Sequence, residues 1–424
     1  MPVSLRTQQS RKQADMSASV FQDPAIYARD LPPPAVKFSG LPRFNFIGGH
    51  NDPEHIPIEG LVEAASAVIR REGRDLAMYN LAKGPQGHPG LRQVIADKLQ
   101  RHRGIDASAD EVLVVTGSGQ AINMIVRMLI NAGDTVLVEE FCYAGSISRF
   151  RAAGARTVAL PVDEQGIRID ALEEILAAQK AQGIRPKFIY TIPTIQNPTG
   201  SVMPLERRQQ LLALSKEYGV PIFEDECYAD LVWAGAAPPA LYALDPAQVI
   251  HIGSFSKTLA PALRLGYIVA PWELLAKLIP LKADSGTGAL DQMIVAEFFG
   301  QHFDQHVSEL TAILKDKCNT MIEAVEREFG SNAELFKPEG GIFLWIKLPE
   351  AVDVTQLIAP AAQVGVAFNP GPEWSVDAAS TKSYLRLCFG SATKDDINEG
   401  VKRFARVCYE QTGIPAHSDN KANT

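Results

Sequence analysis

Paired cysteines and metal-ligating clusters are missing from this sequence. It has five cysteines: Cys142, Cys227, Cys318, Cys388 and Cys408. Their odd number, wide scatter and lack of any C-x-x-C spacing exclude a disulfide framework and a zinc knuckle, so we expect ordinary buried thiols. The stretch "HFDQH" places His302 and His306 one helical turn apart, without the H-E-x-x-H glutamate or a third ligand. We therefore predict a solvated helix face there and no metal site.

Long apolar runs and blocks of one charge are missing too. No stretch approaches the roughly 18 uninterrupted apolar residues of a membrane helix, and the first 20 residues lack the apolar core of a signal peptide. The net charge is -8 and no block of consecutive Lys or Arg occurs, which argues against a nucleic-acid partner. We expect a soluble, cytoplasmic protein that binds small molecules, and neither a membrane nor a nucleic acid.

The apolar segments that are present predict an α/β fold. From about residue 90, short apolar runs such as "EVLVVT", "VPIFEDE" and "QVIHIGSF" alternate with helix-like segments such as "ERRQQLLALSKEY". Apolar strands separated by helices are typical of a mostly parallel sheet covered on both faces. A long helical region through residue 330, short strands in "GGIFLWIKLP" and "YLRLCFG", and a final helix near "DDINEGVKRFARVCYE" predict a smaller α+β domain.

The chain is long enough for two cores, with 424 residues and 46% apolar content. We divide it into an N-terminal arm (1–40), a first segment of the small domain (41–75), a large domain (76–285), a connecting helix with the small C-terminal domain (286–411) and a tail (412–424). The proline-rich arm is expected to lie over the body, and the tail, which lacks apolar anchors, to fray.

A glycine-containing turn joins a strand to a helix in "EVLVVTGSGQAINMI". Two consecutive glutamates end the next strand about 20 residues on, so a dinucleotide site is a rival interpretation. However, Ile122 replaces the third glycine of that fingerprint and would hinder close packing of the helix on the strand. The backbone N–H groups of Ser118, Gly119 and Gln120 still predict an anion site suited to a phosphate. An ordinary capped turn is the alternative.

Polar groups also gather where three further strands end. In chain order they are Asn197, Asp225, Tyr228, Ser254, Ser256 and Lys257, in "YTIPTIQNPTG", "VPIFEDECYADL" and "VIHIGSFSKTL". Because ligands of open α/β sheets bind outside the carboxyl ends of the strands, we expect these groups to converge. A lysine among apolar residues is a candidate nucleophile, although a lysine that packs its stem and solvates its head is the common alternative.

One cofactor uses a phosphate site, a lysine, a carboxylate and phenol or amide donors together: pyridoxal phosphate. Its ring accepts electrons only while the pyridine nitrogen stays protonated, which an adjacent carboxylate such as Asp225 ensures. The ordered set "TGSGQ", "NPTG", "DECY", "SFSKTLAPALRLGY" and "YLRLCFG" resembles the fold-type I aminotransferases of classes I and II, especially their aminoadipate and kynurenine aminotransferase branch. The resemblance covers most of the chain, from about "FNFIGGHNDPEHIP" onward.

The resemblance implies a role for each matched residue. It implies that Lys257 forms the Schiff base with pyridoxal 5'-phosphate and moves the substrate's α-proton, and that Asp225 pairs with the ring nitrogen. Asn197 and Tyr228 would hydrogen-bond the phenolic oxygen of the cofactor, and Asn197 also lies near the substrate. The phosphate would be held by Arg264, Ser254, Ser256, Ser118 and Gly119, with Gln120 beside them.

Four more positions match the family and also have ordinary explanations. Tyr143 matches the aromatic residue that stacks on the cofactor ring, although taken alone it would be read as a core tyrosine. Tyr79 matches the tyrosine that reaches the neighbouring subunit's cofactor, which implies a homodimer with shared active sites, but it could be a loop tyrosine. Gly49 matches a backbone position near the substrate, or a routine turn. Arg386 matches the arginine that binds the substrate carboxylate, or is a water-facing edge residue.

The implied activity is transamination between an α-amino acid, preferably aromatic or long aliphatic, and a 2-oxo acid such as 2-oxoglutarate. A lyase, decarboxylase, racemase or oxidase on the same fold is the alternative. An aminotransferase-like effector-binding module is a distant one, because the 40-residue arm is too short and too weakly basic for a DNA-binding domain. The helical connector "LIPLKADSGTGALDQMIV" offers no arginine for a second substrate carboxylate, and its Asp284 and Asp291 could be caps or surface charges.

Overall fold

The computed structural model of the chain describes residues 21, 23–28, 31, 34–233 and 235–416. The chain divides into two compact units, Met1–Gly40 and Leu41–Thr424. In the first unit a short 3₁₀ helix, Pro24–Ile26, begins after Asp23, whose carboxylate accepts a hydrogen bond from the Ala25 N–H. The expected position of the arm over the body stays a prediction. Most of the tail that we expected to fray, from residue 417, lies outside the described residues.

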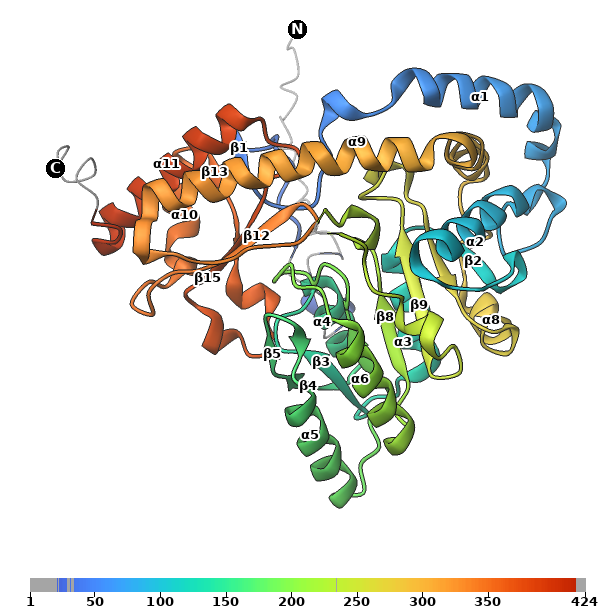
Figure 1. The fold of residues 1–424 in the computed structure, drawn as a ribbon, viewed down its shortest axis with the longest axis horizontal. Helices are drawn as coiled ribbons and strands as arrows, with labels where there is room; N and C mark the ends of the chain where they lie inside the picture. Colours follow the sequence, from blue (N-terminus) through green and yellow to red (C-terminus); the bar gives the residue numbers. More distant parts are fainter. Residues whose placement is uncertain (1–20, 22, 29–30, 32–33, 234, 417–424) are drawn as a thin grey trace, which may run out of the picture. The chain divides into compact units, whose positions relative to one another are not determined.

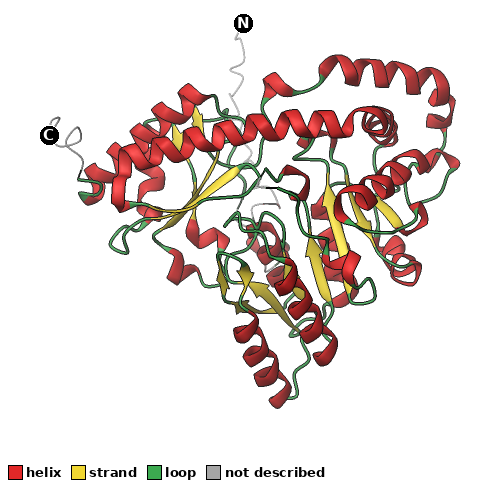
Figure 2. Cartoon of the chain, in the orientation of Figure 1, coloured by secondary structure: helices red, strands yellow, loops and turns green. Residues whose placement is uncertain are grey.

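A seven-stranded sheet organises the second unit (Figures 1 and 2). Its strands in spatial order are β2 (Val112–Val115), β10 (Gly266–Val269), β9 (Val249–Ser254), β8 (Ile222–Asp225), β7 (Ile189–Thr191), β3 (Thr135–Glu139) and β4 (Arg156–Leu160). β10 runs antiparallel to both of its neighbours, and the remaining adjacent pairs are parallel. The predicted mostly parallel α/β sheet is confirmed.

Helices cover both faces of this sheet, as its apolar strands require. One face shares a core with α3 (Ser118–Leu129), α4 (Ala144–Ala152) and α8 (Trp272–Leu278). The other face shares a core with α2 (Pro89–Arg103), α5 (Ile169–Ala181), α6 (Leu205–Tyr218), α7 (Leu241–Leu244) and the first turns of α9 (Ala289–Phe329). Because successive strand residues point to opposite faces, the neighbours Val114 and Val115 enter different cores.

A four-stranded antiparallel sheet forms the predicted α+β region. Its strands in spatial order are β11 (Glu334–Phe336), β12 (Phe343–Lys347), β15 (Tyr384–Cys388) and β14 (Asn369–Pro370). It shares a third core with the second half of α9, with α10 (Ile358–Gln363) and with α11 (Lys394–Thr412). The strand β1 (Phe44–Asn45) pairs in parallel with β13 (Val366–Ala367), so the start of this unit joins its end.

α9 connects the two sheets (Figure 1). Its residues Val295 to Phe303 enter the core of the large sheet, and its residues Leu310 to Phe329 enter the core of the small one. α1 (Ile58–Glu72) packs along α9, and its Ala64 joins the large-sheet core. The segment that we assigned to the small domain as 41–75 therefore contributes to both cores. Its boundaries and those of the other domains stay predictions.

Local details depart from the sequence analysis at two places. His302 is exposed on α9, but His306 is half-buried against Phe298 and its Nε2 lies 2.7 Å from the Thr258 carbonyl oxygen, so only part of the predicted solvated face is solvated. The expected helical connector contains a non-helical loop, 282–288, before α9 begins.

The structure also bears on the predictions for the cysteines and for membrane helices. All five cysteines are free, and only Cys227 is not fully buried. No helix within the described ranges is both long and apolar enough to cross a membrane. The cytoplasmic location stays a prediction.

Candidate active site

A cavity of about 320 Å³ lies where the carboxyl ends of β8 and β9 and the turns after β2 and β7 face β15 of the small sheet. All of the predicted site residues line it except Gln120 and Tyr79. The predicted residues on its wall are Gly49, Ser118, Gly119, Tyr143, Asn197, Asp225, Tyr228, Ser254, Ser256, Lys257, Arg264 and Arg386. The ends of strands in the large sheet and the centre of a strand in the small sheet thus contribute side chains to one site. The strand ends meet there because parallel strands have their carboxyl ends at the same edge of a sheet.

Lys257 follows β9 by three residues and projects into this cavity. Its Nζ donates a hydrogen bond of 2.8 Å to the Gly49 carbonyl oxygen, and no carboxylate of a described residue pairs with it. Burial lowers the pKa of Lys257, because an ammonium is disfavoured away from water. A larger fraction of the amine is therefore neutral and nucleophilic than in an exposed lysine.

Gly49 lies in the loop that covers Lys257. A Cβ at this position would lie 2.4 Å from Lys257 Nζ, so a side chain would displace the amine. Asn51 fixes the same loop, because its Nδ2 donates to the Leu259 carbonyl oxygen at 2.9 Å. The close approach explains why glycine occupies position 49.

Asp225 ends β8 and is 4% exposed. Its Oδ2 accepts a 2.7 Å hydrogen bond from the Tyr190 hydroxyl, which in turn accepts one of 2.9 Å from the Ser146 hydroxyl. Burial raises the pKa of the Asp225 carboxyl group. A cationic partner in the cavity would reverse that shift, since an adjacent positive charge favours the carboxylate. Tyr190 and Ser146 orient Asp225 from behind, and the sequence analysis did not identify either of them.

Arg386, at the centre of β15, is 3% exposed. Its Nη1 donates to Asn197 Oδ1 at 2.9 Å, and its Nη2 donates to the Gly48 carbonyl oxygen at 2.8 Å and to Asn369 Oδ1 at 2.9 Å. All three acceptors are uncharged, and Nε has no partner. Burial lowers the pKa of Arg386, and the described part of the chain supplies no ion pair to it. A buried, unpaired guanidinium is suited to an anionic ligand.

The aromatic side chains near Arg386 shape the same end of the cavity. The guanidinium carbon of Arg386 lies 3.7 Å from the centre of the Trp374 ring, and the Trp374 ring neighbours that of Tyr143. Tyr228 is buried, and its hydroxyl accepts a long hydrogen bond of 3.4 Å from Asn197 Nδ2. Burial raises the pKa of Tyr228, which keeps the phenol protonated and able to donate.

The opposite end of the cavity is formed by the start of α3. Gly117 precedes the helix with φ of 74°, and the N–H groups of Ser118 and Gly119 have no acceptor among the described residues. A Cβ at Gly117 would lie 2.3 Å from Nη2 of Arg264, so this arginine lies directly against the turn. Free N–H groups at a helix start beside an arginine suit an anion, and the predicted phosphate site here stays a prediction.

Gln120 and Tyr79 lie outside the cavity. The Gln120 N–H bonds to the Gly117 carbonyl oxygen, and its side chain turns away to bond the Thr116 N–H and Asp284 Oδ2, each at 2.8 Å. Its backbone N–H and one Nε2 hydrogen are thus used within the protein, and its predicted contact with the cofactor stays a prediction. Tyr79 is 85% exposed. Its contact with a neighbouring subunit stays a prediction.

Several residues on the cavity wall were not predicted. They are Gly48, Arg149, Ile192, Cys227, Asn369 and Trp374. Trp374 and Asn369 belong to segments without a recognisable motif, and Arg149 lies on α4, a helix that we did not predict. Only Cys227, inside the "DECY" stretch, and Gly48, beside Gly49, were adjacent to residues that the sequence singled out.

The positions of Glu139 and Glu140 contradict the interpretation of this region as a dinucleotide site. Glu139 is fully buried, and accepts hydrogen bonds from the Thr191 hydroxyl at 2.6 Å and from Gln196 Nε2 at 2.9 Å. Burial raises its pKa to about 7. Glu140 accepts from the Val162 N–H. Neither side chain lines the cavity at the start of α3, so neither is placed to bind a ribose.

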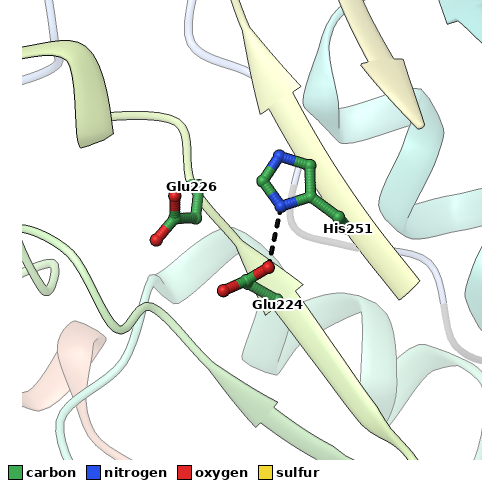
Figure 3. Close-up of side chains that lie close together, drawn as sticks. All are labelled: Glu224, Glu226 and His251. Carbon is green, nitrogen blue, oxygen red and sulfur yellow. Dashed lines mark hydrogen bonds and ion pairs between the residues drawn. The ribbon is translucent and has the colours of Figure 1, made fainter. Parts of the chain in front are cut away.

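A charged network lies on the other face of β8, behind Asp225. Figure 3 shows His251 facing Glu224 across neighbouring strands, with its Nδ1 2.8 Å from Glu224 Oε2, and Glu226 beside them. The three side chains have the spacing of a metal site. However, Arg103 donates to both oxygens of Glu226, at 2.6 and 2.8 Å, and Arg208 lies 3.6 Å away. These guanidinium charges overcome the effect of burial and lower the pKa of Glu226 to about 2, so the cluster is an ion-pair network.

Comparison with known proteins identifies the class. Residues 49–404 match the family described as aminotransferase class I and II. The chain is 34% identical over 369 residues to a 2-aminoadipate transaminase of Thermus thermophilus, covering 86% of this chain and 89% of that protein. It is 33% identical over 368 residues to aromatic-amino-acid aminotransferase 1 of Thermococcus litoralis, covering 86% and 87%.

A solved structure agrees with these matches. The α-aminoadipate aminotransferase LysN of Thermus thermophilus, complexed with N-(5'-phosphopyridoxyl)-L-leucine, superposes with a TM-score of 0.80 at 34% identity, covering 87% of this chain and 92% of that one. The chain belongs to the aminotransferase class I and II family. It is accordingly a pyridoxal-phosphate-dependent transferase, as the sequence motifs imply.

The ion-pair network behind Asp225 gives a stability prediction. Arg103→Gln removes the guanidinium that donates to both Glu226 oxygens and leaves only Arg208, 3.6 Å away, so we expect the free energy of unfolding to fall by about 3–5 kcal/mol. Arg101→Gln, on the same helix, breaks an exposed pair with Asp304 and is expected to change it by less than about 1 kcal/mol. Urea unfolding of both variants measures the difference. Similar losses for the two variants would contradict the structural role of the buried pair.

Proposed function

We propose that this protein transfers the amino group of an aromatic or long aliphatic α-amino acid to a 2-oxo acid such as 2-oxoglutarate. The observation that carries the proposal is the buried guanidinium of Arg386, which hydrogen-bonds only neutral oxygens in the cavity that also contains Lys257. A substrate carboxylate would complete it as a bidentate partner.

The residues on the cavity wall suit each polar part of pyridoxal 5'-phosphate. The N–H groups of Ser118 and Gly119 and the Arg264 guanidinium suit the phosphate, together with the hydroxyls of Ser254 and Ser256. The buried carboxyl of Asp225 suits a protonated ring nitrogen, and Asn197 with Tyr228 suits the phenolic oxygen. Tyr143, which lines the cavity, would stack on the ring. When bound, the cofactor supplies an aldehyde that condenses with amines and a ring that draws electrons from the substrate's α-carbon.

Lys257 performs two tasks in this proposal. Its ε-amine would hold the cofactor covalently, and the amine, once free, would accept the α-proton of the substrate and return it. The lowered pKa of Lys257 suits both tasks, because each needs the neutral amine. The Gly49 carbonyl oxygen, which accepts from Nζ, orients the amine inside the cavity. Asp225 holds the proton on the ring nitrogen, and Tyr190 keeps the carboxylate in place.

The preference for large side chains is supported by similar proteins. One relative is named for aromatic amino acids, and the LysN structure holds a leucine derivative. The other relative is named for 2-aminoadipate, a long side chain that ends in a second carboxylate. The loop 282–288 and the start of α9 contain no arginine that could bind a second substrate carboxylate there. An obligatory dicarboxylic substrate is therefore not favoured.

Arg386→Ala tests the substrate class. The variant leaves an amino acid's carboxylate facing neutral groups, so we expect kcat/KM for an amino-acid donor to fall by about 30-fold to several-thousand-fold. The matched control is the corresponding decarboxylated amine, whose kcat/KM should hardly change. Equal losses for the two donors would refute carboxylate recognition by Arg386. A wild-type enzyme that prefers the amine would refute the substrate class.

We also propose that two copies of the chain form a homodimer with shared active sites. Ile58, Val62 and Ile69 are 61%, 57% and 48% exposed and lie along one face of α1. Met78 and Tyr79, a short distance further on, are 60% and 85% exposed. Exposed apolar side chains gathered in this way are typical of an interface, and a second copy that covers them brings Tyr79 to its partner's cofactor.

Charged residues on this face of α1 test the dimer. We expect the wild type to sediment as a dimer and the double variant Val62→Glu, Ile69→Glu to sediment as a monomer, because a carboxylate cannot be buried unpaired in an interface. Ile358→Glu is the matched control, since Ile358 is an exposed isoleucine, 44% accessible, on α10. Sedimentation velocity gives the result. A monomeric wild type, or a dimeric double variant, would overturn the proposal.

A further inference from the structure

Arg149 is a cation on the cavity wall that has no role in the proposed amino-group transfer. It lies on α4, is half-buried, and its Nη1 donates a 2.6 Å hydrogen bond to the Gly145 carbonyl oxygen. Within the described ranges it makes no ion pair. Its guanidinium is therefore oriented by its own helix while its charge remains available.

The position of Arg149 relates it to the start of α3. A Cβ added at Gly119 would lie 3.0 Å from Nη2 of Arg149. A Cβ added at Gly117 would lie 2.3 Å from Nη2 of Arg264. Two guanidinium groups, from α4 and from the segment after β9, thus approach the same first turn. The N–H groups of Ser118 and Gly119 in that turn find no acceptor in the described part of the chain. None of these contacts is shared with Arg386, which bonds Gly48, Asn197 and Asn369.

We propose that Arg149 is a second guanidinium ligand of the cofactor phosphate, opposite Arg264. A phosphate monoester carries nearly two negative charges and has three acceptor oxygens, so it can use both arginines and the helix start together. The inference rests on the proposed function, which places the cofactor in this cavity. Arg149 matters most while the cofactor is not bonded to Lys257, because only noncovalent contacts then hold the cofactor.

Calorimetry with two probes tests the inference without any turnover. Pyridoxamine phosphate cannot bond covalently to Lys257, and pyridoxamine lacks only the phosphate. For the protein freed of cofactor, we expect Arg149→Ala to weaken pyridoxamine phosphate binding by about 10- to 100-fold and to leave pyridoxamine binding unchanged. Arg149→Lys keeps the charge without the forked geometry and should give an intermediate dissociation constant.

Arg151→Ala is the matched control. Arg151 lies two residues further along α4, is exposed, and like Arg149 donates to a backbone carbonyl oxygen, that of Val376. We expect its removal to leave both dissociation constants unchanged. Arg264→Ala serves as the positive reference for a phosphate contact in this cavity.

The outcomes separate the inference from the function beneath it. Weaker pyridoxamine phosphate binding for both Arg149→Ala and Arg264→Ala, with pyridoxamine unaffected, supports the assignment. Weakening by Arg264→Ala alone overturns the assignment of Arg149 and leaves the cofactor site intact. No weakening by either variant overturns the placement of the cofactor in this cavity, and the inference with it. Equal weakening of both probes by Arg149→Ala shows a distorted cavity and refutes a phosphate contact.

Discussion

The burial of cations without carboxylate partners is the constraint on which this site depends. Arg386 and Lys257 are both removed from much of the solvent, and both are hydrogen-bonded to neutral oxygens only. Such burial is unfavourable, since the effective penalty is several kcal/mol per ion in proteins. The protein tolerates it because the loop at residues 48–49 turns its carbonyl groups toward both side chains. The guanidinium charge of Arg386 stays uncompensated, so an anionic ligand can pair with it, whereas burial of Lys257 favours its neutral amine.

The fold brings these groups together by joining two sheets through one loop and one helix. Lys257 and Asp225 stand at strand ends of the large sheet, whereas Arg386 stands on the small sheet. α9 contributes to the cores of both sheets. Its Lys317 forms an ion pair of 2.5 Å with Asp52, which belongs to the loop that covers Lys257. The distances across the cavity therefore depend on packing far from it. The ion pairs of Glu226 on the other face of β8 support the strand that ends in Asp225.

The sequence predicts this site where chemistry and local pattern coincide. The apolar stretch 220–223 gives way to the three acidic residues Glu224, Asp225 and Glu226, so the end of the strand could be located without a structure. Arg149 escaped prediction because α4, "AGSISRFRA", contains glycine and two serines and has no clear apolar period. The direction of the Gln120 side chain could not be predicted for another reason. Its partner Asp284 is 164 residues away, in a loop that the sequence suggested was helical. Contacts across such separations come from tertiary packing, and no local pattern encodes them.

The central claim is that this cavity holds pyridoxal 5'-phosphate on Lys257, and chemical trapping of the holoenzyme tests it most directly. Borohydride reduction makes the link between the cofactor and its lysine permanent, and peptide mass mapping then locates the phosphopyridoxyl group. The geometry of the cavity predicts a single modified peptide that carries the group on Lys257, and none in the Lys257→Ala variant. A phosphopyridoxyl group on a different lysine, or a holoenzyme that borohydride leaves unmodified, would contradict the account.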